Sequence, residues 1–192
     1  MFEKIIALDK QLLVFLNNLG SETCDDFWFV ITDKFCWTPV YLVVMYLMFR
    51  FLGWKKTLFT LFLLALFITF SDQFTNLIRV IFKRLRPNND PIIQHQIRRL
   101  HNSPNYSFIS GHATTSTMVT VFVISLLKPY TKYIKFFVIF PLFFAYSRIY
   151  LGVHFPIDIL TGATVGGGLG FLFFKLHGVW SRRVFKHSNA EE

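Results

Sequence analysis

The chain alternates between long apolar segments and short polar connections. Five apolar segments approach the length that a helix needs to cross the hydrocarbon core of a bilayer. They lie at about residues 36–53, 57–80, 112–128, 133–149 and 156–177. One polar connection, residues 84–111, is longer than the others and rich in Pro, Asn, Arg and His, as water-facing functional loops are. The pattern predicts an all-α, polytopic membrane helical bundle.

The first 34 residues fit two arrangements. Apolar residues between Ile5 and Leu16 leave one polar face on a helix, and Asp25 with Asp26 interrupts the next stretch. Such a segment either lies in the membrane interface or contributes a short first span. We favour the short span, because a total of six spans places the N-terminus on the same side as the C-terminus.

The composition agrees with membrane insertion. Of the 192 residues, 53% are hydrophobic and only 16% are charged, which is too apolar for a soluble domain. A net charge of +9 would suggest nucleic acid in a soluble protein, but most cations flank apolar segments, so no nucleic-acid partner is expected. Cys24 and Cys36 match no metal spacing; they either pair outside the cytoplasm or act as small apolar residues.

The cations also predict the orientation. Alternation of the five spans puts three basic clusters on one side, which identifies that side as cytoplasmic. The clusters are Arg50, Lys55 and Lys56; Lys128, Lys132 and Lys135; and Arg182, Arg183 and Lys186. The loop 84–111 and the connection 148–156 then share the extracytoplasmic face. We expect residues 1–192 to form a single domain, with a motif-bearing core at 57–177 and a cytoplasmic tail at 178–192.

A stripe of polar side chains follows the second apolar segment. Ionisable groups inside spans are costly and are therefore functional candidates. The stripe recurs at spacings of three or four residues and consists of Asp72, Asn76, Arg79, Lys83 and Arg86. We expect these side chains to share one face of a helix that Pro87 ends. Converging guanidinium groups suit phosphate, because each planar fork donates two parallel hydrogen bonds. Lys83 and Arg84 fit interfacial snorkelling as well.

The segment Ser110-Gly111-His112 directly precedes the third apolar segment. A small-residue turn that leads into a helix offers free N–H groups and the positive end of the helix dipole to an anion. His112 would lie at the rim of such a site. Ser110 taken alone has the simpler interpretation of a helix cap.

The last span begins near Pro156, which suits the first turn of a helix. His154 would then lie at the start of the helix, with Asp158 close enough for its carboxylate to bind an imidazole N–H. Such a bond fixes the tautomer and leaves the other ring nitrogen free to attack. A His–Asp pair at this spacing also occurs as a purely structural hydrogen bond.

At these residues the sequence resembles the type 2 phosphatidic acid phosphatase (PAP2) superfamily, whose motifs run K-x6-R-P, P-S-G-H and S-R-x5-H-x3-D. The third motif is complete, whereas the first begins with Arg in place of Lys and the second with Ile in place of Pro. The matching segments are Arg79–Pro87, Ile109–His112 and Ser147–Asp158. The likeness covers about residues 57–177.

This resemblance implies a metal-independent lipid phosphatase that uses no cofactor. It implies that His154 is the nucleophile that forms a phosphohistidine, that Asp158 orients it, and that His112 protonates the leaving group. The groups that would hold the phosphate oxygens are Arg79, Arg86, Ser110, Gly111 and Arg148. The expected active face also lacks a close carboxylate cluster for a metal ion.

A site near the membrane surface favours a lipid phosphate as substrate. On the extracytoplasmic face of a bacterial inner membrane, the choices are an undecaprenyl-type diphosphate, a phosphatidylglycerol phosphate and a lipid A phosphate. The compact chain favours the polyprenyl diphosphate slightly. Phosphoryl transfer to a second lipid and non-enzymatic transport of anionic lipids are the alternatives. The loop cations either contact a second headgroup or form a solvated face; they are His95, Arg98, Arg99 and His101.

Overall fold

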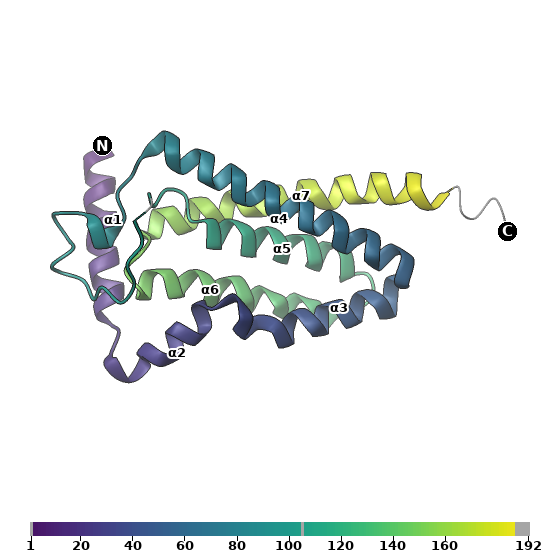
Figure 1. Cartoon of the computed structure of the whole chain (residues 1–192), viewed down its shortest axis with the longest axis horizontal. Coiled ribbons are helices and arrows are strands. Elements are labelled where there is room, and N and C mark those ends of the chain that lie inside the picture. Colours follow the sequence, from purple (N-terminus) through teal and green to yellow (C-terminus); the bar gives the residue numbers. More distant parts are fainter. Residues whose placement is uncertain (1, 105, 187–192) are drawn as a thin grey trace.

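The protein is a bundle of helices (Figure 1). The computed structural model describes residues 2–104 and 106–186, and in these ranges it contains no strand, so the predicted all-α class is confirmed. The α-helices are α1 (Phe2–Asn18), α2 (Glu22–Thr32), α3 (Thr38–Leu52), α4 (Trp54–Phe82), α5 (Gly111–Leu127), α6 (Ile139–Tyr150) and α7 (Pro156–Lys186); the 3-10 helices are η1 (Lys34–Trp37), η2 (Pro87–Asn89) and η3 (Lys132–Val138).

Helices α3 to α7 run along the long axis of the molecule, and α1 lies crosswise at one end (Figure 1). Four described segments have the length and apolar composition to cross a membrane, and α5 is a shorter apolar helix. The four segments are Lys34–Leu52, Trp54–Asn89, Lys132–Tyr150 and Pro156–Phe185. These helices match the five predicted spans. The last helix continues to Lys186, so the first part of the predicted tail at 178–192 is helical, and 187–192 lie outside the described residues.

The N-terminal region differs from the expectation. Before Lys34, no described helix has the length and composition of a span. Helix α1 instead packs on the loop 84–111, where Lys10 Nζ lies 2.6 Å from Asp90 Oδ2 and Asn18 donates to the Gln96 carbonyl. Helix α1 and the C-terminal end of α7 therefore lie at opposite ends (Figure 1). The structure does not support a short first span, because the polar face of α1 pairs with the loop.

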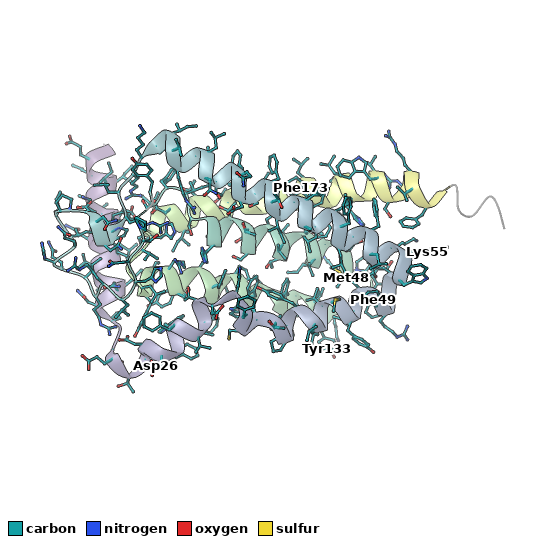
Figure 2. All side chains as sticks on the ribbon, viewed as in Figure 1. Asp26, Met48, Phe49, Lys55, Tyr133 and Phe173 are labelled. Carbon is teal, nitrogen blue, oxygen red and sulfur yellow. The ribbon has the colours of Figure 1, made fainter. Side chains whose placement is uncertain are left out.

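The sides of the bundle are as apolar as its interior. Met48 and Phe173 are 1% and 6% exposed, whereas Phe49 and Tyr133 are 38% and 67% exposed (Figure 2). Large apolar surfaces of this kind mark contact with a membrane. The three basic clusters belong to the turn between α3 and α4, the turn after α5 and the C-terminal end of α7, which lie at the end opposite α1, where Lys55 is labelled in Figure 2.

Helices α5 and α7 pack unusually closely, because glycines line the contact. A Cβ atom added at three glycines of α7 would stand 2.2–2.7 Å from carbonyl oxygens of the facing helix or its cap. The pairs are Gly162 with Ser110, Gly166 with Thr114, and Gly170 with Met118. Small residues four apart let two helix backbones approach in this way. The contact holds the beginning of α5 against the beginning of α7, where two of the three motifs lie.

Candidate active site

Helix α4 supplies one arginine to the site. Asn76 donates to Asp72 Oδ2 at 3.4 Å, and Arg79 Nη1 donates to Asn76 Oδ1 at 3.0 Å, so these three side chains share one helix face as predicted. Arg79 Nε also donates to the Ile109 carbonyl at 3.1 Å. A Cβ at Gly111 would stand 2.7 Å from Arg79 Nη2. The guanidinium therefore lies directly against the beginning of α5, and a side chain at Gly111 would displace it from this position.

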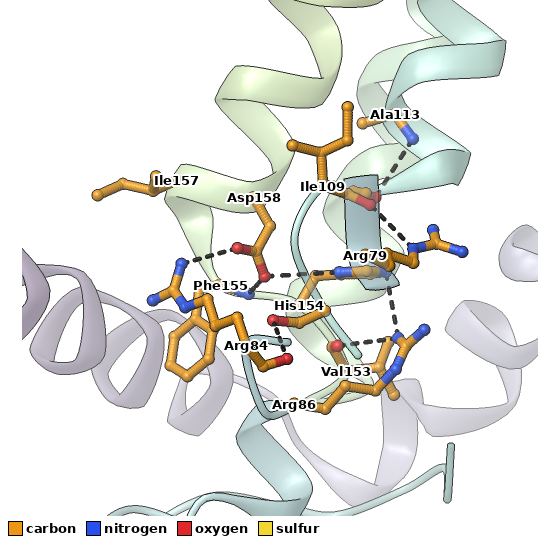
Figure 3. A network of polar contacts seen from close by, with 12 residues as sticks. Arg79, Arg84, Arg86, Ile109, Ala113, Val153, His154, Phe155, Ile157 and Asp158 are labelled. Atoms are coloured by element: carbon orange, nitrogen blue, oxygen red, sulfur yellow. Dashed lines mark hydrogen bonds and ion pairs between the residues drawn. The ribbon is translucent and has the colours of Figure 1, made fainter. Parts of the chain in front are cut away.

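Arg86 reaches the site from the loop and not from α4. The helix ends at Phe82, because Lys83 adopts a left-handed backbone conformation with φ 49°. The prediction that the helical stripe continues to Pro87 is therefore wrong. Arg86 Nη1 lies 3.2 Å from His154 Nε2 (Figure 3). Because the helix ends before Arg86, the loop places this guanidinium next to the imidazole.

The beginning of α5 offers unpaired donors. Ser110 Oγ accepts from the Ala113 N–H at 3.4 Å, and the Ser110 N–H donates to the Asp158 carbonyl at 3.1 Å. Among the described residues, no acceptor binds the N–H groups of Gly111 and His112. These two donors point out of the positive end of the helix, which is a favourable place for an anion. Ser110 is thus a helix cap, and the residues after it keep their capacity to bind phosphate.

Arg148 and His112 complete the set of predicted cationic and basic groups. Arg148 is 7% exposed, and its Nη1 donates to Thr32 Oγ1 at 2.6 Å. Its buried Nε has no hydrogen-bond partner within the described part of the chain. The imidazole of His112 lies 5.0 Å from the ring of Phe144, centroid to centroid. The electrostatic neighbours of His112 are Arg79, Arg86, Arg148 and His154.

His154 precedes α7, which begins at Pro156 as predicted. The imidazole is 1% exposed, and its Nδ1 lies 3.6 Å from Asp158 Oδ2 (Figure 3). This separation is too long for a hydrogen bond, and Nδ1 has no other partner among the described residues. Asp158 Oδ2 accepts instead from the Phe155 N–H at 3.0 Å. The expected His–Asp pair is adjacent and aligned, but its hydrogen bond is not formed.

The surroundings of His154 favour the neutral imidazole. Burial lowers the pKa of His154 well below its usual 6.5, and the positive charges of Arg86, Arg148 and Arg79 lower this pKa further. A contact with the Ser107 backbone acts in the opposite direction and is the smallest influence. The ring is therefore uncharged near neutral pH, and its Nε2 lone pair accepts from Arg86.

Sequence reasoning missed two residues that contact the site. Arg84 Nη1 donates to Asp158 Oδ1 at 2.7 Å, and Nη2 donates to Asp9 Oδ2 at 2.6 Å. The Arg84 guanidinium also lies over the ring of Phe155, 3.9 Å from its centroid. The snorkelling alternative for Arg84 is therefore wrong, because its side chain points inward (Figure 3). Asp9 belongs to the polar face of the amphipathic segment predicted between Ile5 and Leu16.

The loop cation Arg98 has a structural partner. Its Nη2 lies 2.7 Å from both carboxylate oxygens of Asp25, and the Tyr150 hydroxyl donates to Asp25 Oδ1 at 2.6 Å. The hydrogen bond from Arg98 is the main reason why the pKa of Asp25 is lowered. This cluster ties α2 to the loop and occupies Arg98.

Cys24 and Cys36 are both free and exposed.

A cavity of about 790 Å³ extends from the site into the apolar part of the bundle. Its polar end is formed by Asp72, Arg79, Gly111 and His112, and its apolar wall includes Met48, Leu64, Val119, Val123 and Phe140. Helices α3, α4, α5 and α6 all contribute to the lining. The shape suits an amphiphile with a charged head and an apolar tail.

Comparisons with known proteins agree with the motifs. The family model of the PAP2 superfamily matches residues 59–182. A lipid A 4'-phosphatase of Bacteroides thetaiotaomicron is 35% identical over 91% of this chain and 79% of its own length. An undecaprenyl-diphosphatase of Sulfolobus acidocaldarius is 28% identical over 87% of this chain and 70% of its own. The crystal structure of a transmembrane PAP2 type phosphatidylglycerolphosphate phosphatase of Bacillus subtilis has a TM-score of 0.70 and 21% identity, covering 90% of this chain and 86% of that one.

Proposed function

The chain belongs to the PAP2 superfamily and is a membrane lipid phosphatase, and we propose that it acts through a phosphohistidine on His154. The observation that carries this proposal is the position of a buried, neutral imidazole with Nε2 3.2 Å from the Arg86 guanidinium. A phosphoryl group that takes the place of Arg86 at Nε2 meets the proposed nucleophile and keeps the Arg86 guanidinium beside its oxygens. His154 and its arginine neighbour thus combine attack with charge stabilisation.

The proposed reaction has two displacements at phosphorus. His154 Nε2 forms a bond to phosphorus while the bond to the lipid oxygen breaks, and His112 gives its proton to that oxygen. Asp158 Oδ2, 3.6 Å from Nδ1, stabilises the positive charge that develops on the imidazole ring. Water then attacks phosphorus while the bond between phosphorus and Nε2 breaks, His112 takes a proton from the water, and inorganic phosphate leaves with His154 neutral again.

The phosphate oxygens have several donors within reach in this proposal. Arg79 and Arg86 supply guanidinium groups, and the unpaired N–H groups of Gly111 and His112 supply the helix end. The buried Arg148 Nε lacks a hydrogen-bond partner among the described residues, which is a costly state that a phosphate oxygen would relieve. Fixed donors of this kind stabilise the charge on the equatorial oxygens of a transferred phosphoryl group.

For the substrate we propose a phosphate monoester of a lipid A type glycolipid. The support is the 35% identity with a lipid A 4'-phosphatase over 91% of this chain, against 28% over 87% for the undecaprenyl-diphosphatase. The sequence favours a polyprenyl diphosphate slightly, but only because the chain has little soluble structure. The polyprenyl diphosphate is therefore the second candidate. The basic turns lie opposite the site, which supports a site on the extracytoplasmic face of the inner membrane.

The test is phosphate release by the purified protein in detergent, with excess chelator present. The panel contains lipid A, undecaprenyl diphosphate and phosphatidylglycerol phosphate, each carrying labelled phosphate. We expect the highest kcat/KM with lipid A and recovery of the label as inorganic phosphate and not on a second lipid. A higher kcat/KM with undecaprenyl diphosphate would overturn the substrate assignment.

Two variants test the mechanism. His154→Ala should lose both turnover and covalent labelling, because the nucleophile is gone. His112→Ala should still be labelled by substrate, but more slowly, because the nucleophile remains while the protonation of the leaving oxygen is lost. Full turnover by His154→Ala would refute the phosphohistidine.

A further inference from the structure

Asp9 of helix α1 is a buried carboxylate far from the motifs in sequence. Its side chain is fully buried, its Oδ1 accepts from the Ile157 N–H at 2.9 Å, and its Oδ2 accepts from Arg84 Nη2 at 2.6 Å. Burial raises the pKa of Asp9, while the Arg84 hydrogen bond and the Ile157 N–H lower it. An isolated buried carboxylate would be strongly unfavourable. Asp9 therefore depends on these partners, one of which belongs to the first turn of α7.

Arg84 connects Asp9 to Asp158. The same guanidinium donates to Asp9 through Nη2 and to Asp158 through Nη1, and the ring of Phe155 lies under it. Asp158 is thereby held at both oxygens, by Arg84 at Oδ1 and by the Phe155 N–H at Oδ2. These contacts direct Oδ2 toward Nδ1 of His154, 3.6 Å away.

The charges of this cluster have a consequence for the reaction. Arg84 carries one positive charge between two carboxylates, and with both of them ionised the cluster has a net negative charge beside the imidazole. Without Asp9, Arg84 would neutralise Asp158 alone, and that negative charge would be lost. A positive imidazole in the transition state is stabilised more strongly by the first arrangement than by the second, because a buried site screens charge weakly.

We propose that Asp9 and Arg84 are positioning residues for Asp158, so that docking of helix α1 sets the turnover of His154. This inference rests on the proposed function. Helix α1 thereby acts on the site as well as covering one end of the bundle.

The chain offers a matched control in the next residue of α1. Lys10 binds Asp90 with Nζ 2.6 Å from Oδ2, so it joins the same helix to the same loop. This pair has no contact with Asp158 or His154 among the described residues. Asp9→Asn and Lys10→Gln therefore each remove one ion pair of α1, but only the ion pair of Asp9 connects through Arg84 to Asp158.

The experiment compares the two variants in detergent on the lipid that the wild type hydrolyses best. It measures kcat, KM, the rate of His154 phosphorylation and the thermal unfolding midpoint. Asp9→Asn should lower kcat and the phosphorylation rate about ten- to hundredfold, as loss of outer partners of a reactive group does, with KM unchanged. Lys10→Gln should lower the unfolding midpoint less, because its ion pair is partly exposed whereas Asp9 is fully buried, and it should leave kcat near the wild-type value.

Equal kcat values for the two variants would overturn the inference, because Asp9 would then only dock α1. If Asp9→Asn does not fold, Arg84→Lys replaces it: a single ammonium keeps the charge but cannot bridge both carboxylates as a fork does. The same loss of kcat is expected, and full turnover by Arg84→Lys would refute the inference. A wild type that releases no phosphate from any lipid of the panel would refute the proposed function, and this inference with it. An active wild type together with an inactive His154→Ala variant supports the proposed function, so that equal kcat values for Asp9→Asn and Lys10→Gln would then refute this inference alone.

Discussion

Replacing Gly166 by alanine should force helices α5 and α7 apart. The added Cβ would stand 2.2 Å from the Thr114 carbonyl oxygen and 3.0 Å from its carbon. Comfortable contact needs about 3.5 Å, so the helices must separate by about 1 Å at this point. The clashing atoms belong to a helix backbone, so no side-chain rotation relieves the contact.

The separation has a cost in stability and a cost in rate. Overpacking of this kind costs about 1–3 kcal/mol of unfolding free energy. Gly162 lies one turn closer to the site and contacts the Ser110 carbonyl, so the displacement moves the helix end at Gly111 away from His154. A misplacement of about 1 Å in an active site costs about a hundredfold in rate. We therefore expect Gly166→Ala to lose about two orders of magnitude in kcat.

The assay is thermal unfolding in detergent together with phosphate release, and Gly167→Ala is the control. A Cβ at Gly167 meets nothing within 4 Å, and alanine is a better helix former than glycine by about 1 kcal/mol. The control should therefore be as active as the wild type and at least as stable. Equal unfolding midpoints and equal kcat values for the two variants would refute the close-packing argument.

Two further predictions concern the pH profile and the cavity. Burial and three arginines hold the pKa of His154 below 6.5, so the proposed nucleophile should stay neutral in mildly acidic solution. Arg86→Gln removes one positive neighbour, so it should raise this pKa and move the acid limb of the kcat/KM profile to higher pH. Comparison with the wild type on one substrate cancels the titration of the lipid, and an unmoved limb would contradict the assignment of His154 as nucleophile. Val119→Trp should narrow the cavity and reduce hydrolysis of a long-chain lipid phosphate far more than that of a short soluble ester. The control Leu142→Trp faces outward and should leave the hydrolysis of both substrates unchanged. Equal losses on both substrates in Val119→Trp would exclude the cavity as the binding site of the lipid tail.

The spans could be predicted because their signal is local. The segment predicted at 57–80 is the helix Trp54–Phe82, and the one predicted at 112–128 is Gly111–Leu127. Each depends on consecutive apolar residues that lipid or the bundle interior must cover. The neighbouring positions of His154 and Asp158 follow in the same way from a four-residue spacing in the first turn of α7.

The missed features depend on contacts between distant segments. Asp9 and Arg84 are 75 positions apart, and only the docking of α1 on the loop brings them together. The end of α4 is set by Lys83 in a left-handed conformation that usually selects glycine or asparagine, so no residue pattern marked it. Arg86 lies beside His154 as the phosphate-binding hypothesis requires, but it reaches this position from the loop and not from α4. Local pattern thus identifies the candidate groups, while tertiary packing determines which carboxylate or cation each of them meets.

Helix α3 forms the lipid-side wall of the cavity, and only Val44 and Met48 of its side chains are buried. A substrate tail that occupies this space comes from the hydrocarbon phase and never from bulk water. The concentration that governs saturation is then a surface density, counted in molecules per membrane area. Dilution of the substrate with inert lipid, at a constant total amount of substrate, should therefore slow turnover as a competitive inhibitor would. The KM of this enzyme then has physical meaning when it is expressed as a mole fraction of substrate in the membrane.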